Sequence, residues 1–136
     1  MRILIVDDDK LFADQLCLNL KSKISLVNTA YSYEEAVEKL SSTPYDIILQ
    51  DYDLGISNGL DVIENLKSLK ESPMVILMTS YATKELAIKS INLGVNRFIE
   101  KPFRVKELLS LIEIDKKTQD DFKLDPKNYK VTDKGR

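Results

Sequence analysis

Hydrophobic residues recur along the chain in short, nearly unbroken runs, each followed by a polar turn. The strongest runs, at 3–6, 46–50 and 74–78, are typical of strands that are buried on both faces of a parallel sheet. Two weaker segments, at 24–30 and 95–99, have a similar length and also fit strands. The pattern therefore predicts five short strands, spread over most of the chain.

Between these runs, apolar residues are spaced three or four positions apart, as on one face of an α-helix. Helices are predicted over 10–21, 33–40, 60–70, 83–93 and 105–112. Ser32 and Glu35 form a capping box at the start of the second helix, and Gly94 follows the fourth as a C-cap. Residues 55–59 are predicted to be a loop.

Strands that alternate with helices through short connections predict an α/β domain with an open parallel sheet. A chain of 136 residues suits one such domain, which we place at 1–114. The remaining segment, 115–136, is rich in lysine and aspartate and has few apolar residues. Such a segment cannot offset its own ordering entropy, so we predict a linker or tail, or the start of a truncated output domain.

Composition excludes several kinds of chemistry. The net charge of −2 argues against direct binding of nucleic acid by residues 1–114. The absence of histidine excludes histidine triads, histidine-ligated zinc and a histidine phosphocarrier. The single cysteine, Cys17, lies on the apolar stripe of its helix and is interpreted as a core residue. No run approaches the ~20 apolar residues of a membrane span, and no signal peptide follows Met1, so a cytoplasmic location is expected.

Polar side chains follow four of the predicted strands directly. They are Asp7, Asp8 and Asp9, then Asp51 and Asp53, then Thr79 and Ser80, and finally Lys101. Because ligands of open α/β sheets bind beyond the carboxyl ends of the strands, we expect these side chains to share one site. Each feature alone has an ordinary explanation, such as a helix cap or a surface turn, and their conjunction is what favours a functional site.

Carboxylates gathered at one edge repel one another unless a cation lies between them. A set of oxygen ligands without histidine or cysteine favours Mg²⁺, with Mn²⁺ as a plausible substitute. Thr79 can donate a hydrogen bond to a phosphoryl group, and Lys101 can neutralise its charge. Since an aspartate can itself be a nucleophile, the set predicts phosphoryl transfer through an aspartyl phosphate.

As a set, these residues and their spacing resemble the receiver domain of bacterial two-component response regulators. The matching segments are Ile3 to Asp8, Asp46 to Asp51, Leu54, Gly59, Thr79, and Lys101 to Phe103. The resemblance covers residues 1 to about 114. It implies a flavodoxin-like (βα)5 fold, a doubly wound parallel sheet with the strand order 2-1-3-4-5.

The resemblance also implies a role for each residue of the acidic site. Asp51 is the phosphoacceptor, Asp8 a direct Mg²⁺ ligand and Asp7 a ligand through water, while the backbone carbonyl of Asp53 completes the metal site. Lys101 pairs with the phosphoryl group. The donor is a sensor histidine kinase or a phosphotransfer protein. Such a domain is no turnover enzyme, because it catalyses only its own phosphorylation and dephosphorylation.

Two further residues are assigned to the switch by the same resemblance. Thr79 contacts the phosphoryl group and moves toward it on activation, and Phe98 occupies the position of the switch aromatic. Asp53 and Tyr81 flank the site and are expected to tune the phosphoryl lifetime. The chain departs from the family where Gly55 replaces the usual proline and where polar Gln50 replaces an apolar residue.

Three alternatives remain open from the sequence. A haloacid-dehalogenase-type phosphatase would use Asp51 and Asp53, but its acidic metal pair should follow the lysine rather than precede it. A receiver that acts only as an interaction module is unsupported, because every residue of the site is present. The segment 122–135 resembles the first strands of the OmpR/PhoB DNA-binding domain, which predicts a fragment of a transcription regulator rather than a single-domain regulator. A homodimer on phosphorylation is one expectation, although Asn96 and Arg97 replace the acids that serve its salt bridges.

Overall fold

A five-stranded parallel sheet forms the centre of the molecule in the computed structural model, which describes residues 1–54, 57–66, 69 and 72–118. Its strands are β1 (Arg2–Val6), β2 (Leu26–Ala30), β3 (Ile47–Asp51), β6 (Met74–Thr79) and β7 (Arg97–Glu100). They lie in the order β2-β1-β3-β6-β7, and all four pairings are parallel. Counted along the chain within this sheet, that order is 2-1-3-4-5. The predicted flavodoxin-like fold is confirmed.

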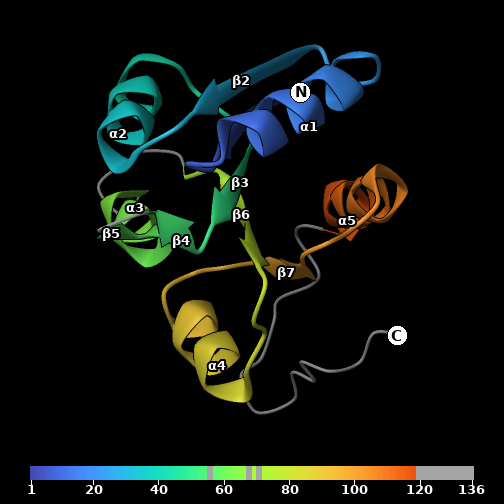
Figure 1. The fold of residues 1–136 in the computed structure, drawn as a ribbon. Coiled ribbons are helices and arrows are strands. Elements are labelled where there is room, and N and C mark those ends of the chain that lie inside the picture. Colours follow the sequence, from blue (N-terminus) through green and yellow to red (C-terminus); the bar gives the residue numbers. More distant parts are fainter. Residues whose placement is uncertain (55–56, 67–68, 70–71, 119–136) are drawn as a thin grey trace.

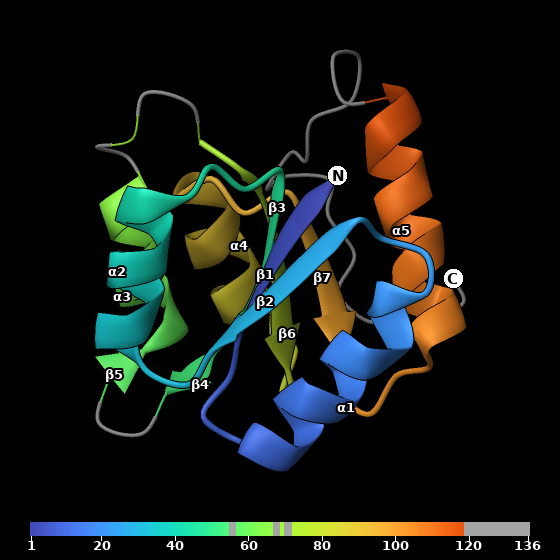
Figure 2. The ribbon, with the colours of Figure 1, turned by 90° about the horizontal axis from the view of Figure 1, so that it is seen from above.

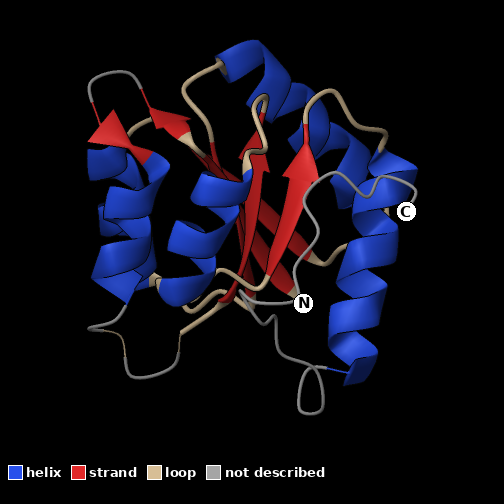
Figure 3. Ribbon diagram, turned by 90° about the horizontal axis from the view of Figure 1, so that it is seen from below, coloured by secondary structure: helices blue, strands red, loops and turns tan. Residues whose placement is uncertain are grey.

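Among the residues that the structure describes, five helices cover the two faces of the sheet (Figures 1 and 2). They are α1 (Lys10–Lys21), α2 (Tyr33–Ser42), α3 (Gly59–Leu66), α4 (Lys84–Asn92) and α5 (Val105–Thr118). Helices α1 and α5 pack on one face, and α2, α3 and α4 on the other, so the sheet is sandwiched between two helical layers (Figure 3). Burial on both faces explains why the central strands are apolar without alternation.

The helix starts follow the capping signals of the sequence. The side chain of Asp9 accepts a hydrogen bond from the backbone N–H of Phe12, and Ser32 Oγ accepts one from Glu35. The reciprocal bond of the predicted capping box differs, because Glu35 Oε1 accepts from the N–H of Tyr31, one residue before the cap. Gly94 has a φ of 101°, the left-handed conformation that favours glycine after a helix.

Some boundaries differ from the prediction. Strand β2 begins at Leu26 rather than at residue 24, because the N–H groups of Lys23 and Ile24 still bond to Leu20 at the end of α1. Part of the predicted loop is a strand, because β5 (Ser57–Asn58) pairs with β4 (Asp53–Leu54), just before that loop, as a small antiparallel hairpin.

At the C-terminal end, helix α5 continues to Thr118, past the boundary predicted at residue 114. Residues 119–136 lie outside the described residues, so the division between domain and tail stays a prediction, as does the resemblance of 122–135 to an output domain. Within the described ranges, no helix combines the length and apolar character that a membrane span requires.

Candidate functional site

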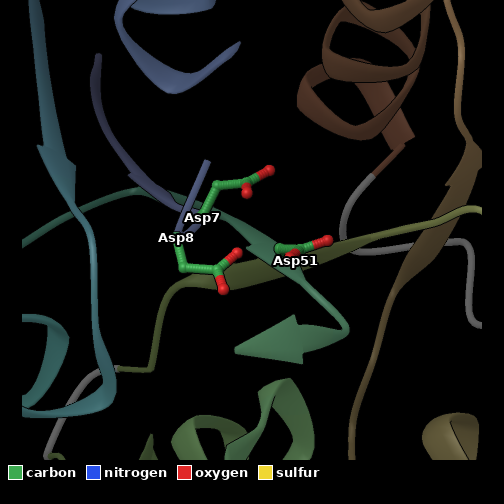
Figure 4. A group of neighbouring side chains, drawn as sticks. All are labelled: Asp7, Asp8 and Asp51. Carbon is green, nitrogen blue, oxygen red and sulfur yellow. The ribbon is translucent and has the colours of Figure 1, made fainter. Parts of the chain in front are cut away.

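Three carboxylates from two neighbouring strands meet at one edge of the sheet. Asp7 and Asp8 follow β1, and Asp51 ends β3, the strand that pairs with β1. Each contributes an oxygen atom to a group in which all the oxygens lie within 4.8 Å of one another (Figure 4). Asp7 and Asp51 are buried, whereas Asp8 is exposed. The structure thus brings together Asp7, Asp8 and Asp51, three of the acids that the sequence placed at this edge.

Lys101 supplies the positive charge next to two of these acids. Its Nζ atom lies 2.7 Å from Oδ2 of Asp7 and 3.0 Å from Oδ1 of Asp51. The backbone N–H of Lys101 donates to the carbonyl of Thr79, which anchors the lysine at the end of β6. The side chain of Lys101 is half-buried, so water screens this double ion pair only in part.

The crowding of these charges shifts two pKa values. Burial raises the pKa of the Asp51 carboxyl to about 7, and the charge of Asp7 raises it as well, while the hydrogen bond from Lys101 opposes both effects. Burial lowers the pKa of the Lys101 ammonium, but its hydrogen bonds to the two acids more than offset this, so the net shift is upward. Near neutral pH, Lys101 is therefore charged and Asp51 titrates.

Asp9, the third acid after β1, has a structural role. Asp9 caps α1 through its side chain, and its backbone N–H donates to Oδ1 of Asp7 at 3.0 Å. Of the run that follows β1, Asp7 and Asp8 thus belong to the acidic site. Asp9 orients Asp7 and begins the helix.

Thr79 lies at the end of β6 and is buried. Its hydroxyl accepts a hydrogen bond from the backbone N–H of Tyr81 and donates to the carbonyl of the same residue, at 3.1 and 3.3 Å. The ring of Tyr81 is 80% exposed. Thr79 is thus next to the site, with its hydroxyl engaged in the following loop.

Two other predicted residues are not among the clustered carboxylates. Phe98 is half-buried against the α2–α3–α4 face, the side of the sheet opposite α1 and α5. Asp53 is exposed in the β4–β5 hairpin, two residues beyond Asp51.

Sequence reasoning missed two neighbours of the site. Nζ of Lys101 lies 4.4 Å from the ring centroid of Phe12 on α1, a cation–π contact, and the ring of Phe103 packs perpendicular to that of Phe12 with the centroids 5.8 Å apart. Gln50, at the end of β3, donates from its side-chain amide to the backbone carbonyl of Asp51. In the sequence, Phe12 is only one of the apolar residues on its helix face, and nothing marks it as part of the site. Gln50, in contrast, stands out as a polar residue inside an apolar run.

The donor set fits a hard divalent cation, because it offers carboxylate oxygens on a rigid strand edge and an exposed acid open to solvent. Beside it, Asp51 presents an oxygen that the Lys101 ammonium touches, as a nucleophile for phosphoryl transfer requires. The arrangement can hold a cation and a phosphoryl group side by side.

Comparison with known proteins agrees with this chemistry. The family model for the response regulator receiver domain matches residues 3–113. The sensory transduction protein LytR of Staphylococcus epidermidis is 31% identical over 140 residues, covering 98% of this chain and 55% of the relative. The cell cycle response regulator CtrA of Brucella ovis is 30% identical, covering 82% of this chain and 48% of the relative. The chain spans about half the length of these curated relatives.

Solved structures agree as well. A CheY-like receiver domain from Methanospirillum hungatei is 30% identical, with a TM-score of 0.80 over 87% of this chain and 94% of the other. A two-component response regulator from Clostridium difficile, 23% identical, shares the fold with a TM-score of 0.81 over 89% and 99% of the two chains. The family is therefore shown: this chain belongs to the receiver domains of response regulators, which accept a phosphoryl group in two-component signalling.

Proposed function

We propose that Asp51 is the residue of this receiver domain that accepts the phosphoryl group. The observation that carries the proposal is the position of its carboxylate, which is buried between the acids after β1 and the ammonium of Lys101. In the transfer, an Asp51 oxygen forms a bond to phosphorus while the bond from phosphorus to the donor breaks. The leaving group of the donor keeps that bond's electron pair.

The neighbouring residues divide the remaining work. Receiver domains bind Mg²⁺ through acidic residues, and we assign that role here to Asp7, Asp8 and Asp51, with the backbone carbonyl of Asp53. The cation, with Mn²⁺ as a substitute, would supply charge neutralisation for the phosphoryl oxygens. Lys101 is already within reach of the acceptor oxygen, so it can move from Asp51 to a phosphoryl oxygen without changing its anchor at Thr79.

The switch is assigned to Thr79 and Phe98. The Thr79 hydroxyl is hydrogen-bonded to the backbone of Tyr81, and on phosphorylation it turns from Tyr81 to the phosphoryl group. That movement draws the segment after β6 toward the site. Phe98, half-buried on the neighbouring strand, then repacks into the space that the segment leaves.

A receiver domain implies contact with a histidine kinase or phosphotransfer protein, and such domains are generally not turnover enzymes. We propose that this one catalyses only its own phosphorylation and dephosphorylation, in the cytoplasm. Relatives include proteins named transcriptional regulators, such as CutR of Streptomyces coelicolor. Regulation of transcription by the whole protein, and a homodimer on phosphorylation, are proposals on that basis.

The haloacid-dehalogenase alternative receives no support from the family match. Steady hydrolysis of p-nitrophenyl phosphate by the wild type would revive it. The proposal itself is tested by incubating the chain with Mg²⁺ and acetyl phosphate and measuring intact mass. The wild type should gain one phosphoryl group and Asp51→Asn none. A mass gain in Asp51→Asn equal to that of the wild type would overturn the assignment.

A further inference from the structure

A polar side chain lies in the middle of the core next to the acceptor. Gln50 is fully buried at the end of β3, on the α2–α3–α4 face of the sheet. Its partners across the ladder are Val6 on β1 and Leu77 on β6, both of them buried. A buried amide is unfavourable unless hydrogen bonds replace those that it made to water.

That compensation is incomplete. Nε2 of Gln50 donates to the backbone carbonyl of Asp51 at 2.9 Å. Its Oε1 atom, in contrast, is buried without a hydrogen-bond partner among the described residues. An apolar side chain would fill the same place between Val6 and Leu77 without this cost. A residue that breaks a local rule of the core in this way points to a functional constraint.

We call residues 51–59 the acceptor segment. The carbonyl of its first residue, Asp51, accepts the hydrogen bond from Gln50 and also lies against its last residue, Gly59. A Cβ atom added to Gly59, the first residue of α3, would lie 2.0 Å from the Asp51 carbonyl oxygen and 2.9 Å from Nε2 of Gln50. The backbone N–H of Gly59 donates to the carbonyl of Tyr52. Helix α3 therefore starts directly against the last residues of β3, in a space that only glycine leaves open.

These contacts bring the two ends of the acceptor segment together next to the acidic site. Gly59, at the start of α3, lies against the carbonyl of Asp51, at the end of β3, and Asp53 stands between these two residues in the sequence. We infer that Gln50 is a positioning residue that, with the Asp51 carbonyl and Gly59, forms a clasp fixing both ends of the acceptor segment. The inference rests on the proposed function in that Asp51 is taken as the acceptor.

The clasp acts through the backbone. The hydrogen bond from Gln50 restrains the peptide plane after Asp51. It therefore limits rotation about the Cα–C bond of Asp51, and with it the direction of the Asp51 side chain. It fixes the distance that the chain must span to place the Asp53 carbonyl at the acidic site. Because phosphoryl transfer depends on alignment, a looser peptide here should lower the rate without disturbing the rest of the sheet.

The test uses the whole 136-residue chain and the substitution Gln50→Met, which removes the amide and keeps a long, unbranched side chain. Its matched control is Leu77→Met, a volume-conserving change at the adjacent position of β6, on the same face. The melting temperature of each protein is recorded as a check of folding. Three further quantities are then measured: the exchange rate of the Gly59 amide by NMR without metal, the Mg²⁺ dissociation constant by calorimetry, and the rate of phosphorylation by acetyl phosphate.

We expect Gln50→Met to keep or raise the melting temperature, to exchange the Gly59 amide faster, and to lose about three- to tenfold in Mg²⁺ affinity and phosphorylation rate. Leu77→Met should match the wild type in all three. Wild-type amide exchange, affinity and rate in Gln50→Met would overturn the inference while leaving Asp51 as the acceptor. Failure of both Gln50→Met and Gln50→Leu to fold would also overturn it, because the amide would then be structural. Absence of label on Asp51 in the wild type would instead contradict the proposed function.

Discussion

The Nζ atom of Lys101 lies 3.0 Å from Oδ1 of Asp51, and the same ammonium lies still closer to Asp7. One cation therefore compensates two buried acids that belong to different strands. It holds the end of β7 against the ends of β1 and β3, and it occupies the position from which a phosphoryl group on Asp51 can be neutralised.

Removal of the Lys101 ammonium should destabilise the metal-free fold. In Lys101→Met, two buried carboxylates lose their shared counter-charge, and the partial exposure of the lysine and protonation of an acid limit the loss. We expect a decrease of about 1–3 kcal/mol in the free energy of unfolding, measured by urea denaturation at neutral pH. Added Mg²⁺ should restore part of the loss. An unchanged unfolding free energy would show that the ion pairs contribute nothing to stability.

Removal of an acid should have the opposite consequence. Asp8 is exposed and adds to the negative charge around Asp51. Asp8→Ala should leave the metal-free melting temperature unchanged or raise it, because repulsion falls, and it should weaken Mg²⁺ binding. Melts with and without Mg²⁺ test both parts, since at a fixed concentration a tighter-binding ligand raises the melting temperature further. A large loss of stability without metal would mean that Asp8 is structural.

The raised pKa of Asp51 predicts a pH dependence with a definite sign. The folded carboxyl titrates at about 7, whereas an unfolded aspartate titrates near ~3.9. Between these values the folded state holds a proton that the unfolded state has released, so the stability of the metal-free protein should fall as pH rises from ~4 to ~7. Asp51→Asn should lack this component, and the exposed-acid control Asp61→Asn should keep it. Equal pH slopes for wild type and Asp51→Asn would contradict the pKa assignment.

The exposed ring of Tyr81 should control the phosphoryl lifetime. Hydrolysis needs a water in line with phosphorus, opposite Asp51, and we expect a large ring two residues beyond Thr79 to obstruct that approach. Tyr81→Ala should shorten the lifetime by up to roughly tenfold, followed as loss of phosphoryl mass in Mg²⁺ buffer. Tyr81→Phe keeps the ring and should behave as the wild type. A lifetime in Tyr81→Ala as long as that of the wild type would leave Tyr81 as a partner contact.

The strands and the acidic site were predictable from sequence because both depend on local patterns. Apolar runs ended in aspartates at Asp7 and Asp51, and parallel strands place such ends at one edge. The β4–β5 hairpin was missed, because two-residue strands carry no periodicity to detect.

Contacts between distant segments could not be predicted from the sequence either, because local patterns do not report them. The double ion pair of Lys101 and its contact with Phe12 depend on how α1 packs against the end of β7. Gln50 was visible as an irregularity, but its bond to the Asp51 carbonyl depends on the side-chain rotamer and on the close return of Gly59. Such features follow from packing geometry and not from spacing along the chain.

The role of Asp51 as the acceptor is tested by identifying the residue that carries the phosphoryl group. The chain is treated with Mg²⁺ and acetyl phosphate, the aspartyl phosphate is reduced with borohydride to a stable alcohol, and the digested peptides are sequenced by mass spectrometry. We expect conversion at Asp51 alone, dependent on Mg²⁺ and absent in Asp51→Asn. Conversion at Asp7, Asp8 or Asp53 in the wild type, with Asp51 unmodified, would contradict it.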